Sequence, residues 1–257
     1  MDDTQRPVAR QDVIDGLGKG LRVIEAFDDT HPRLTPSQVA ERTGISRTAA
    51  RRYLLSLLHF GYAGSDGKLF WLTPRVLRLG QSYLESARLP RLVQPFIQRL
   101  SMATGETVNM SVLDGHEVVY VARSNPPRFV SVGYHVGVRV PAHGVTPGVV
   151  ILATWPDEAL DAWIAAHDFA RYTAHTVTAP TQFRSTVQAA RGLGYWITEQ
   201  QLEMGLVGIG LALKDRKGDC PGALSMTLPA QNYTSALMVD KLLPLLHEAA
   251  QSLRPLL

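Results

Sequence analysis

The side chains best suited to binding a polyanion cluster in the first third of the chain. Arginine donates two parallel hydrogen bonds, which suits guanine edges and phosphates, while serine and threonine hydroxyls contact either. The set comprises Ser46, Arg47, Thr48, Arg51, Arg52 and Lys68. In a helix over 47–59, Thr48 and Arg52 face away from the apolar stripe, and Arg47 lies nearer to it. We predict that this helix reads duplex DNA, although an ordinary solvated face would fit the helix alone equally well.

Charge is distributed unevenly along the chain. Residues 33–80 carry eight Lys or Arg against two acids, although the net charge of all 257 residues is only +3. Residues 81–257 carry 14 positive and 14 negative side chains. This asymmetry favours a polyanionic partner for the first third only, the alternative being a solubilising surface.

The helix at 47–59 follows a segment with clear start and stop signals. Thr35 is a predicted N-cap, Pro36 suits the first helical position, and Gln38 completes a capping box. Gly44 supplies a left-handed stop, and Ser46 is the next predicted N-cap. So short a connection between two helices is typical of a helix-turn-helix.

A hairpin is predicted directly after these helices. Short β-prone runs at 62–63 and 69–72 flank a turn that contains Asp66-Gly67, a strong hairpin signal. Lys68 beside the turn is placed to meet phosphate. Helix, turn, helix and hairpin in this order predict a winged helix-turn-helix domain over 13–72 that binds double-stranded operator DNA.

The segments on either side of this unit are predicted as follows. Before it, a short helix is expected over 21–27, and Gly16, Gly18 and Gly20 indicate a flexible arm. After it, Thr73 as a cap and Pro74 start a linker helix over 73–89, which Pro90 ends or redirects. This helix could pack only on its own domain, but we favour pairing of two subunits, because one winged helix covers only a half-site.

The remaining residues, 90–257, mix hairpins with helices. Strands are predicted at 107–113, 118–123, 129–132, 136–140, 195–198, 207–213 and 223–228, and helices at 92–102, 145–155, 157–167, 182–193 and 233–253. The order is not a regular βαβ alternation, so the predicted fold class is α+β with an antiparallel sheet.

Motifs for catalysis are absent from the sequence. It contains no HExxH, no GxSxG and no GxxxxGK[ST] pattern, and His143 in Pro-Ala-His-Gly is expected to be structural. We therefore expect no enzyme, no cofactor and no metal. A single cysteine, Cys220, forms no intrachain disulfide, and no apolar run reaches 18 residues, which favours a cytoplasmic protein without membrane segments. An enzyme with a docking winged helix, and an architectural DNA-binding protein whose second domain only oligomerises, remain alternatives.

Six longer blocks of sequence resemble one known family. They are ARRYLLSLLHFGY at 50–62, DGKLFWLTPRVLRLG at 66–80, VLDGHEVVYVAR at 112–123, GVRVPAHGVTPGVVILA at 137–153, GYWITEQQLEMGLVGIGLAL at 194–213 and GALSMTLPA at 222–230. In order and spacing they resemble the IclR family of bacterial transcription regulators over essentially the whole chain. Within it they are most similar to the PcaR, PcaU and PobR group, which controls breakdown of aromatic acids through the β-ketoadipate and related pathways.

The resemblance implies an architecture and a set of partners. The N-terminal winged helix and the linker helix would be followed by a C-terminal GAF-like effector domain. The effector would be a small organic acid, and the assembly a homodimer or a tetramer made from dimers. RNA polymerase is a further candidate partner.

The resemblance also implies where the effector binds. Family members that bind small acids use a loop after the P-x-H segment, an acidic residue, a cysteine and two hydroxyls. The matching positions in this sequence are Thr146-Pro147, Thr198, Gly208, Ser225 and Thr227. Ser225 and Thr227 would also fit an ordinary strand.

Several of these positions depart from the family pattern. Thr198 replaces the acid, Gly208 replaces the cysteine, and Pro147 has no N–H to offer. Val145 and Val149 stand where the loop usually has Thr and Lys or Arg. We infer fewer polar groups, more room at Gly208, and a larger or more apolar acid than one of glyoxylate size.

An aromatic or dicarboxylic acid is the expected effector. Its carboxylate needs a cation or several convergent donors. Arg139 and Arg123 are the candidate cations, although each could equally be a surface ion-pair residue.

Overall fold

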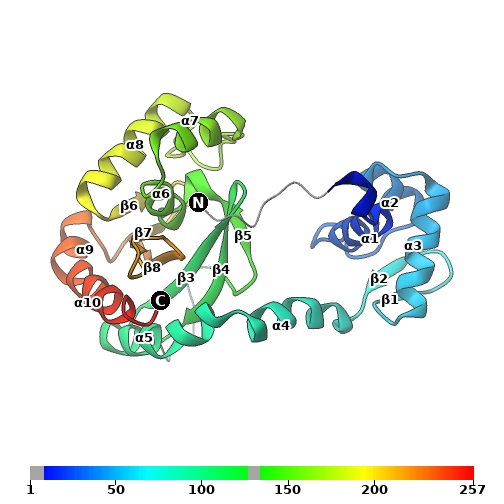
Figure 1. Ribbon diagram of the computed structural model, residues 1–257, viewed down its shortest axis with the longest axis horizontal. Coiled ribbons are helices and arrows are strands. Elements are labelled where there is room, and N and C mark those ends of the chain that lie inside the picture. Colours follow the sequence, from blue (N-terminus) through cyan, green and yellow to red (C-terminus); the bar gives the residue numbers. More distant parts are fainter. Residues whose placement is uncertain (1–8, 127–133) are drawn as a thin grey trace. The chain divides into compact units, whose positions relative to one another are not determined.

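The structure is a computed structural model that describes residues 9–126 and 134–257 (Figure 1). It contains two compact units that divide between Tyr83 and Leu84. The predicted linker over 73–89 spans this division, and its role as a separate linker stays a prediction. The predicted α+β fold class is confirmed, with a small hairpin in the first unit and a six-stranded antiparallel sheet in the second.

The first unit is a three-helix domain with a hairpin. After a short 3-10 helix η1 (Arg10–Asp12), its elements are α1 (Asp15–Glu25), α2 (Pro36–Thr43), α3 (Arg47–His59), β1 (Ala63–Ser65) and β2 (Phe70–Leu72). Its core is formed by buried apolar side chains from every helix and from the hairpin, namely Val23, Leu34, Val39, Ala50, Leu54 and Phe70. Leu34 also forms an isolated β-bridge with Phe70, which ties the hairpin to the start of α2.

The caps predicted for α2 and α3 are confirmed. The Thr35 hydroxyl accepts a hydrogen bond from the Gln38 N–H at 3.4 Å, and Gln38 Oε1 accepts one from the Thr35 N–H at 2.9 Å. Gly44 ends α2 in the left-handed region with φ of 68°, and the Ser46 hydroxyl caps α3 by accepting from the Ala49 N–H. These local signals fix where α3 begins.

The flexible arm predicted around the N-terminal glycines is wrong. Gly16, Gly18 and Gly20 lie inside α1, which starts six residues earlier than the predicted helix at 21–27. A Cβ on Gly16 or Gly20 would lie 3.5 or 3.7 Å from the side chain of Tyr53 on α3. These are ordinary van der Waals distances, so α1 packs beside Tyr53 without requiring glycine at either position.

The helix predicted over 73–89 is divided differently in the structure. A 3-10 turn, η2 (Pro74–Val76), leads into α4 (Leu77–Ser86), and α5 (Arg88–Thr104) follows after Ala87. Thr73 does not cap, because its hydroxyl donates to the Gly61 carbonyl at 2.6 Å. Pro90 does not end a helix but lies in the first turn of α5, where its missing N–H would have no helical partner anyway.

The sheet of the second unit has the strand order β5-β4-β3-β8-β7-β6. The strands are β3 (Thr107–Asp114), β4 (Glu117–Ser124), β5 (Arg139–Pro141), β6 (Trp196–Glu199), β7 (Leu206–Leu213) and β8 (Gly222–Pro229). All of them pair antiparallel. The predicted strand at 129–132 lies outside the described residues.

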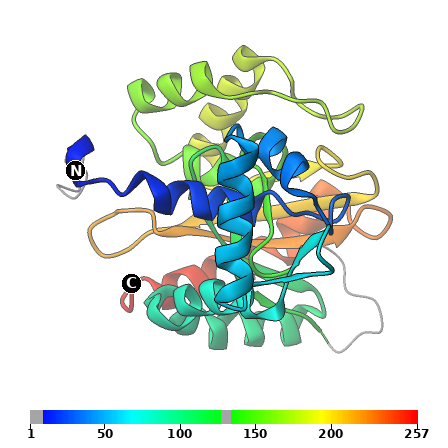
Figure 2. The same cartoon turned by 90° about the vertical axis from the view of Figure 1, so that its right-hand side faces the viewer.

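Helices cover both faces of this sheet, as Figures 1 and 2 show. On one side lie α5 and the closing helices α9 (Ser235–Lys241) and α10 (Leu243–Leu253); on the other lie α6 (Thr146–Leu152), α7 (Asp157–Ala166) and α8 (Pro180–Leu193). The single closing helix predicted over 233–253 is wrong, because it breaks at Leu242 before Pro244, which has no N–H to continue the ladder. Within 9–126 and 134–257, no helix is both long and apolar enough to cross a membrane.

Alternation along β8 gives the sheet two chemically different faces. Leu224 and Met226 join the apolar core against α5 and α10. Ser225 and Thr227 face the opposite side, where they line a cavity. The strand thus supports a dry core with one set of side chains and a polar site with the other.

Candidate functional site

The first candidate site is the exposed face of α3. Arg47, Thr48, Arg51 and Arg52 are all exposed. Within the described residues, the ion pairs of the protein include none of these arginines. The Ser46 hydroxyl, by contrast, is already used as the cap of α3. The structure therefore presents three unpaired guanidinium groups on one short stretch of helix, a suitable surface for an anionic partner.

Arg42, in the same unit, has a structural role instead. Arg42 donates from Nε to the Ala26 carbonyl at 2.8 Å and forms an ion pair with Asp28. Hydrogen bonds from Thr30 and His31, together with the Arg42 charge, hold the pKa of the Asp28 carboxyl well below its usual range. Arg42 thus ties α2 to the segment after α1.

The hairpin tip holds Lys68 at the surface. The Asp66 carboxylate accepts hydrogen bonds from the N–H groups of Lys68 and Leu69 at 3.0 and 2.8 Å. Gly67 occupies the positive-φ region at 96°, as the predicted Asp-Gly turn requires. The exposed Lys68 ammonium is therefore carried on an ordered turn.

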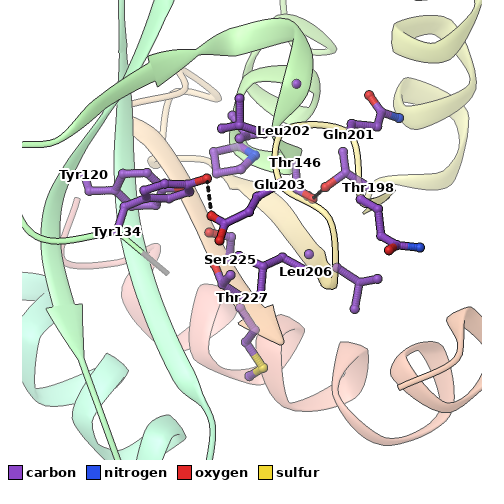
Figure 3. Close-up of a pocket in the computed structure, with 17 residues that line it drawn as sticks. Tyr120, Tyr134, Thr146, Thr198, Gln201, Leu202, Glu203, Leu206, Ser225 and Thr227 are labelled. Atoms are coloured by element: carbon purple, nitrogen blue, oxygen red, sulfur yellow. Dashed lines mark hydrogen bonds between the residues drawn. The ribbon is translucent and has the colours of Figure 1, made fainter. Parts of the chain in front are cut away.

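The second candidate site is a small cavity in the second unit, partly open to solvent (Figure 3). Its walls are the start of α6, the adjacent face of β6, β7 and β8, and the loop between β6 and β7. Five residues predicted from the sequence line it together: Thr146, Thr198, Gly208, Ser225 and Thr227. Their role in effector binding stays a prediction.

The space next to Gly208 is occupied by a pair of hydroxyl groups. Thr146 Oγ1 and Thr198 Oγ1 lie 2.7 Å apart in a buried hydrogen bond. A Cβ on Gly208 would lie 2.8 Å from the first oxygen and 3.2 Å from the second. The expectation of extra room at Gly208 is therefore wrong, because the two threonines fill that space.

Unsatisfied polar atoms lie on the strands below the cavity. Ser225 Oγ is buried and, within the described residues, has no hydrogen-bond partner. Asn109 lies opposite Ser225 in the β3–β8 register and donates to Thr227 Oγ1 at 3.3 Å, while its own Oδ1 has no partner there. A buried polar atom without a partner costs about 1–3 kcal/mol, so this part of the sheet has hydrogen-bonding capacity that a ligand could satisfy.

An aromatic wall closes one side of the cavity. The rings of Tyr120 and Tyr134 lie 5.6 Å apart, and the Tyr134 hydroxyl donates to Glu203 Oε2 at 3.2 Å. Burial raises the pKa of Tyr120 above its usual value. Burial, followed by the negative charge of Glu203, raises the pKa of Tyr134 to about 12. Both phenols therefore remain protonated at neutral pH.

The sequence analysis did not identify these wall residues. Tyr120, Tyr134 and Glu203 come from three separate segments, and no local motif joins them. Asn109 had a usable signal, since a polar residue alternates there with the apolar Val108 and Met110 of a buried strand.

The two arginines predicted as candidate cations do not line the cavity. Arg139 forms ion pairs with Asp114 and Glu117 at 2.8 and 2.7 Å. Arg123 donates to Asn125 Oδ1 at 2.7 Å and to the Tyr134 carbonyl, behind the aromatic wall. Among the described residues that line the cavity there is no Lys, Arg or His, so a carboxylate bound there would rely on neutral donors.

Three histidines form a hydrogen-bonded chain beside the cavity. His143 Nε2 donates to the Ala170 carbonyl at 3.0 Å, so its Nδ1 accepts from His167 Nε2 at 2.7 Å. His167 Nδ1 in turn accepts from His116 Nδ1 at 3.2 Å. Each neutral ring thus uses one N–H, and the Trp163 ring stacks on His167 at 4.3 Å. Burial lowers the pKa of His143, and burial with the neighbouring imidazoles lowers the pKa of His167 to about 4.

A winged helix with an unpaired cationic face, together with a second unit that holds a cavity, is an arrangement typical of ligand-responsive transcription regulators. The chain belongs to the IclR family. The family's helix-turn-helix domain matches residues 16–67, and the domain described as "Bacterial transcriptional regulator IclR C-terminal" matches residues 81–254. This is a family of transcription regulators and not of enzymes, in agreement with the lack of catalytic motifs in the sequence.

The alignments with named relatives extend over nearly the whole chain. The p-hydroxybenzoate hydroxylase transcriptional activator of Acinetobacter baylyi is 41% identical over 97% of this chain and 94% of its own length. A Rhodococcus sp. RHA1 protein described as a transcriptional regulator has a similar crystal structure, with 38% identity, a TM-score of 0.80, and coverage of 94% of this chain and 97% of that one.

A ligand is present in some of the similar solved structures. One of them is the inducer-binding domain of a PobR double mutant from Acinetobacter in complex with 3-hydroxybenzoic acid. That domain is 34% identical to this chain, with a TM-score of 0.64, and the match covers 66% of this chain and all of that one.

Replacing Arg52 tests the exposed face of α3. We expect Arg52→Ala to weaken operator binding by about 1–3 kcal/mol and to leave the thermal midpoint unchanged, because the side chain has no partner within the described protein. Fluorescence anisotropy with duplex DNA from the protein's own promoter measures this. Arg216→Ala removes the same charge from an exposed turn of the second unit and serves as the control. Equal affinities of the two variants would remove Arg52 from the recognition surface.

The hydrogen-bonded histidines predict that the folded protein loses stability at acidic pH. Between about pH 6.5, the ordinary histidine pKa, and about pH 4, the unfolded chain binds a proton at residue 167 that the folded protein does not. Stability therefore rises with pH in that window and is lost as pH falls through it. Between pH 7 and 5 the unfolding midpoint should fall by on the order of 3 °C more in the wild type than in His167→Asn. Calorimetry at pH 7, 6 and 5 tests this, and parallel slopes for the two proteins would contradict it.

Proposed function

We propose that this regulator senses an aromatic hydroxy acid and adjusts the transcription of genes for the breakdown of such acids, of the β-ketoadipate pathway type. The single observation that carries the proposal is the pairing of an aromatic wall with the unsatisfied Ser225 hydroxyl inside one cavity. The named relatives support it, because one activates transcription for p-hydroxybenzoate hydroxylase and a similar solved domain binds 3-hydroxybenzoic acid.

The lining of the cavity suits a single-ring acid. The Tyr120 and Tyr134 rings offer edges and faces to an aromatic ring, and Leu202 and Leu206 add apolar surface. The hydroxyls of Ser225 and Thr227 on β8 converge on the carboxylate, in place of a cation.

The first unit is proposed to bind operator DNA through α3 and the hairpin. Thr48, Arg51 and Arg52 would contact base edges, and Arg47 and Lys68 would contact phosphates. The Ser46 hydroxyl caps α3, so only its backbone N–H is proposed to approach a phosphate.

We infer that the protein assembles as a homodimer, or as a tetramer of dimers, through apolar side chains of the first unit. Ile14, just before α1, is 75% exposed, Leu17 on α1 is 64% exposed, and Leu77 on α4 is 74% exposed. Large apolar side chains left in water at helical spacing favour a protein partner, and pairing of two subunits would place two recognition helices on two half-sites. In this arrangement α4 serves as the linker. The protein would act in the cytoplasm, with RNA polymerase as a candidate partner.

Effector binding can alter transcription only through a difference in affinity. The acid must bind more tightly to either the DNA-competent or the incompetent arrangement of the protein, and DNA must then alter acid affinity by the same factor.

Blocking the cavity tests the proposed function. Ser225→Leu places a bulky apolar side chain among the donors and should abolish binding of 4-hydroxybenzoate, while Ser225→Ala should weaken it by about 1–3 kcal/mol. Isothermal titration calorimetry on the full-length protein measures both, and operator binding without acid should persist in each variant. An unaltered titration curve for Ser225→Leu would show that the acid binds elsewhere.

A further inference from the structure

We propose that Glu203 determines effector specificity, by accepting a hydrogen bond from a hydroxyl group on the ring of the acid. The inference rests on the proposed function of the cavity. It adds that the effector must be a monocarboxylate with a ring hydroxyl, and that benzoate and aromatic dicarboxylates are rejected.

Glu203 is the charged side chain among the described residues that line the cavity. Figure 3 shows its carboxylate directed toward Tyr134, and the Tyr134 hydroxyl donates to Oε2 at 3.2 Å. A carboxylate has about four acceptor positions. The bond from Tyr134 occupies one of them, and no other hydrogen bond or ion pair within the described residues reaches the Glu203 carboxylate, so it can accept a second hydroxyl.

The loop that carries Glu203 is ordered by hydrogen bonds on both sides. The Gln200 side chain accepts from the Gly205 N–H at 2.9 Å, and the Gln200 N–H donates to the Leu206 carbonyl at 2.8 Å. Thr173 and Thr176 donate to the carbonyls of Gln200 and Gln201 at 2.7 and 2.6 Å. Gln200 adopts φ of 54°, a conformation that a side-chain-bearing residue holds only when its surroundings impose it. These hydrogen bonds hold the backbone of the loop that carries Glu203 in one conformation.

Charge then sets the direction in which an acid can bind. The negative Glu203 has no lining cation beside it among the described residues, so it repels a carboxylate placed near it. In the proposed orientation the carboxylate of the acid lies toward the neutral hydroxyls of Ser225 and Thr227 on β8. A ring hydroxyl directed to Glu203 then donates a hydrogen bond, whereas a second carboxylate placed there is repelled.

A titration series on the full-length protein tests this assignment. The probes are 4-hydroxybenzoate, benzoate, which lacks the hydroxyl, and terephthalate, which replaces it with a carboxylate. We expect the wild type to bind 4-hydroxybenzoate at least about tenfold more tightly than benzoate, because a hydrogen bond to a charged group contributes about 1.5–3 kcal/mol. Terephthalate should bind more weakly still, because its second carboxylate carries the same charge as Glu203.

Three variants distinguish the contribution of Glu203 to ligand preference from that of other residues. In Glu203→Leu the preference for 4-hydroxybenzoate over benzoate should fall below about threefold, while the affinity for benzoate stays within that factor or rises. Tyr134→Phe removes the competing donor but keeps the carboxylate, so it should retain the preference. Glu158→Leu replaces an exposed glutamate on α7 outside the lining and should match the wild type. Glu203 is exposed, so its replacement is not expected to disturb folding.

The possible results are distinguishable. Loss of the preference in Glu203→Leu alone supports the assignment. A preference that persists in Glu203→Leu, with normal binding of 4-hydroxybenzoate, overturns this inference and leaves the proposed function standing. Failure of the wild type to bind any of the three acids overturns both.

Discussion

A buried hydroxyl group without a hydrogen-bond partner is the constraint on which the second unit depends. Ser225 lies on β8, a strand flanked on both sides, and strand alternation directs its side chain away from the apolar core of Leu224 and Met226. Most buried polar groups in folded proteins are satisfied, so an exception needs an explanation. The proposed effector would provide one by supplying the missing hydrogen-bond partner.

The same reasoning applies to charge. Arg42 and Arg139 are compensated by carboxylates of the chain and hold segments together. Arg47, Arg51 and Arg52 have no such compensation within the described protein. We propose that the uncompensated arginines of α3 bind DNA and that the unsatisfied Ser225 hydroxyl on β8 binds the carboxylate of the effector. In the same proposal Glu203 repels unsuitable acids, and repulsion is an effective way to exclude the wrong ligand.

Local signals predicted much of the fold, and non-local ones explain the errors. The caps at Thr35 and Ser46 and the Asp66-Gly67 turn act over three or four residues, so the sequence alone located α2, α3 and the hairpin. Gly16 and Gly20 were misread because the helix that contains them packs against Tyr53, more than thirty residues away, and local composition does not reveal that contact. The resemblance to a family placed Ser225 and Thr227 in the cavity, but Tyr134 and Glu203 meet there only through the fold.

Binding of the acid in the cavity is proposed to change the affinity of the protein for operator DNA. The most direct test is the affinity of the full-length protein for its promoter DNA at one fixed ionic strength, with and without saturating 4-hydroxybenzoate, beside a random duplex of equal length. The account predicts a change of about five- to 150-fold for the promoter, in either direction, and a reciprocal change in acid affinity when promoter is present. The same affinity with and without bound acid would contradict it.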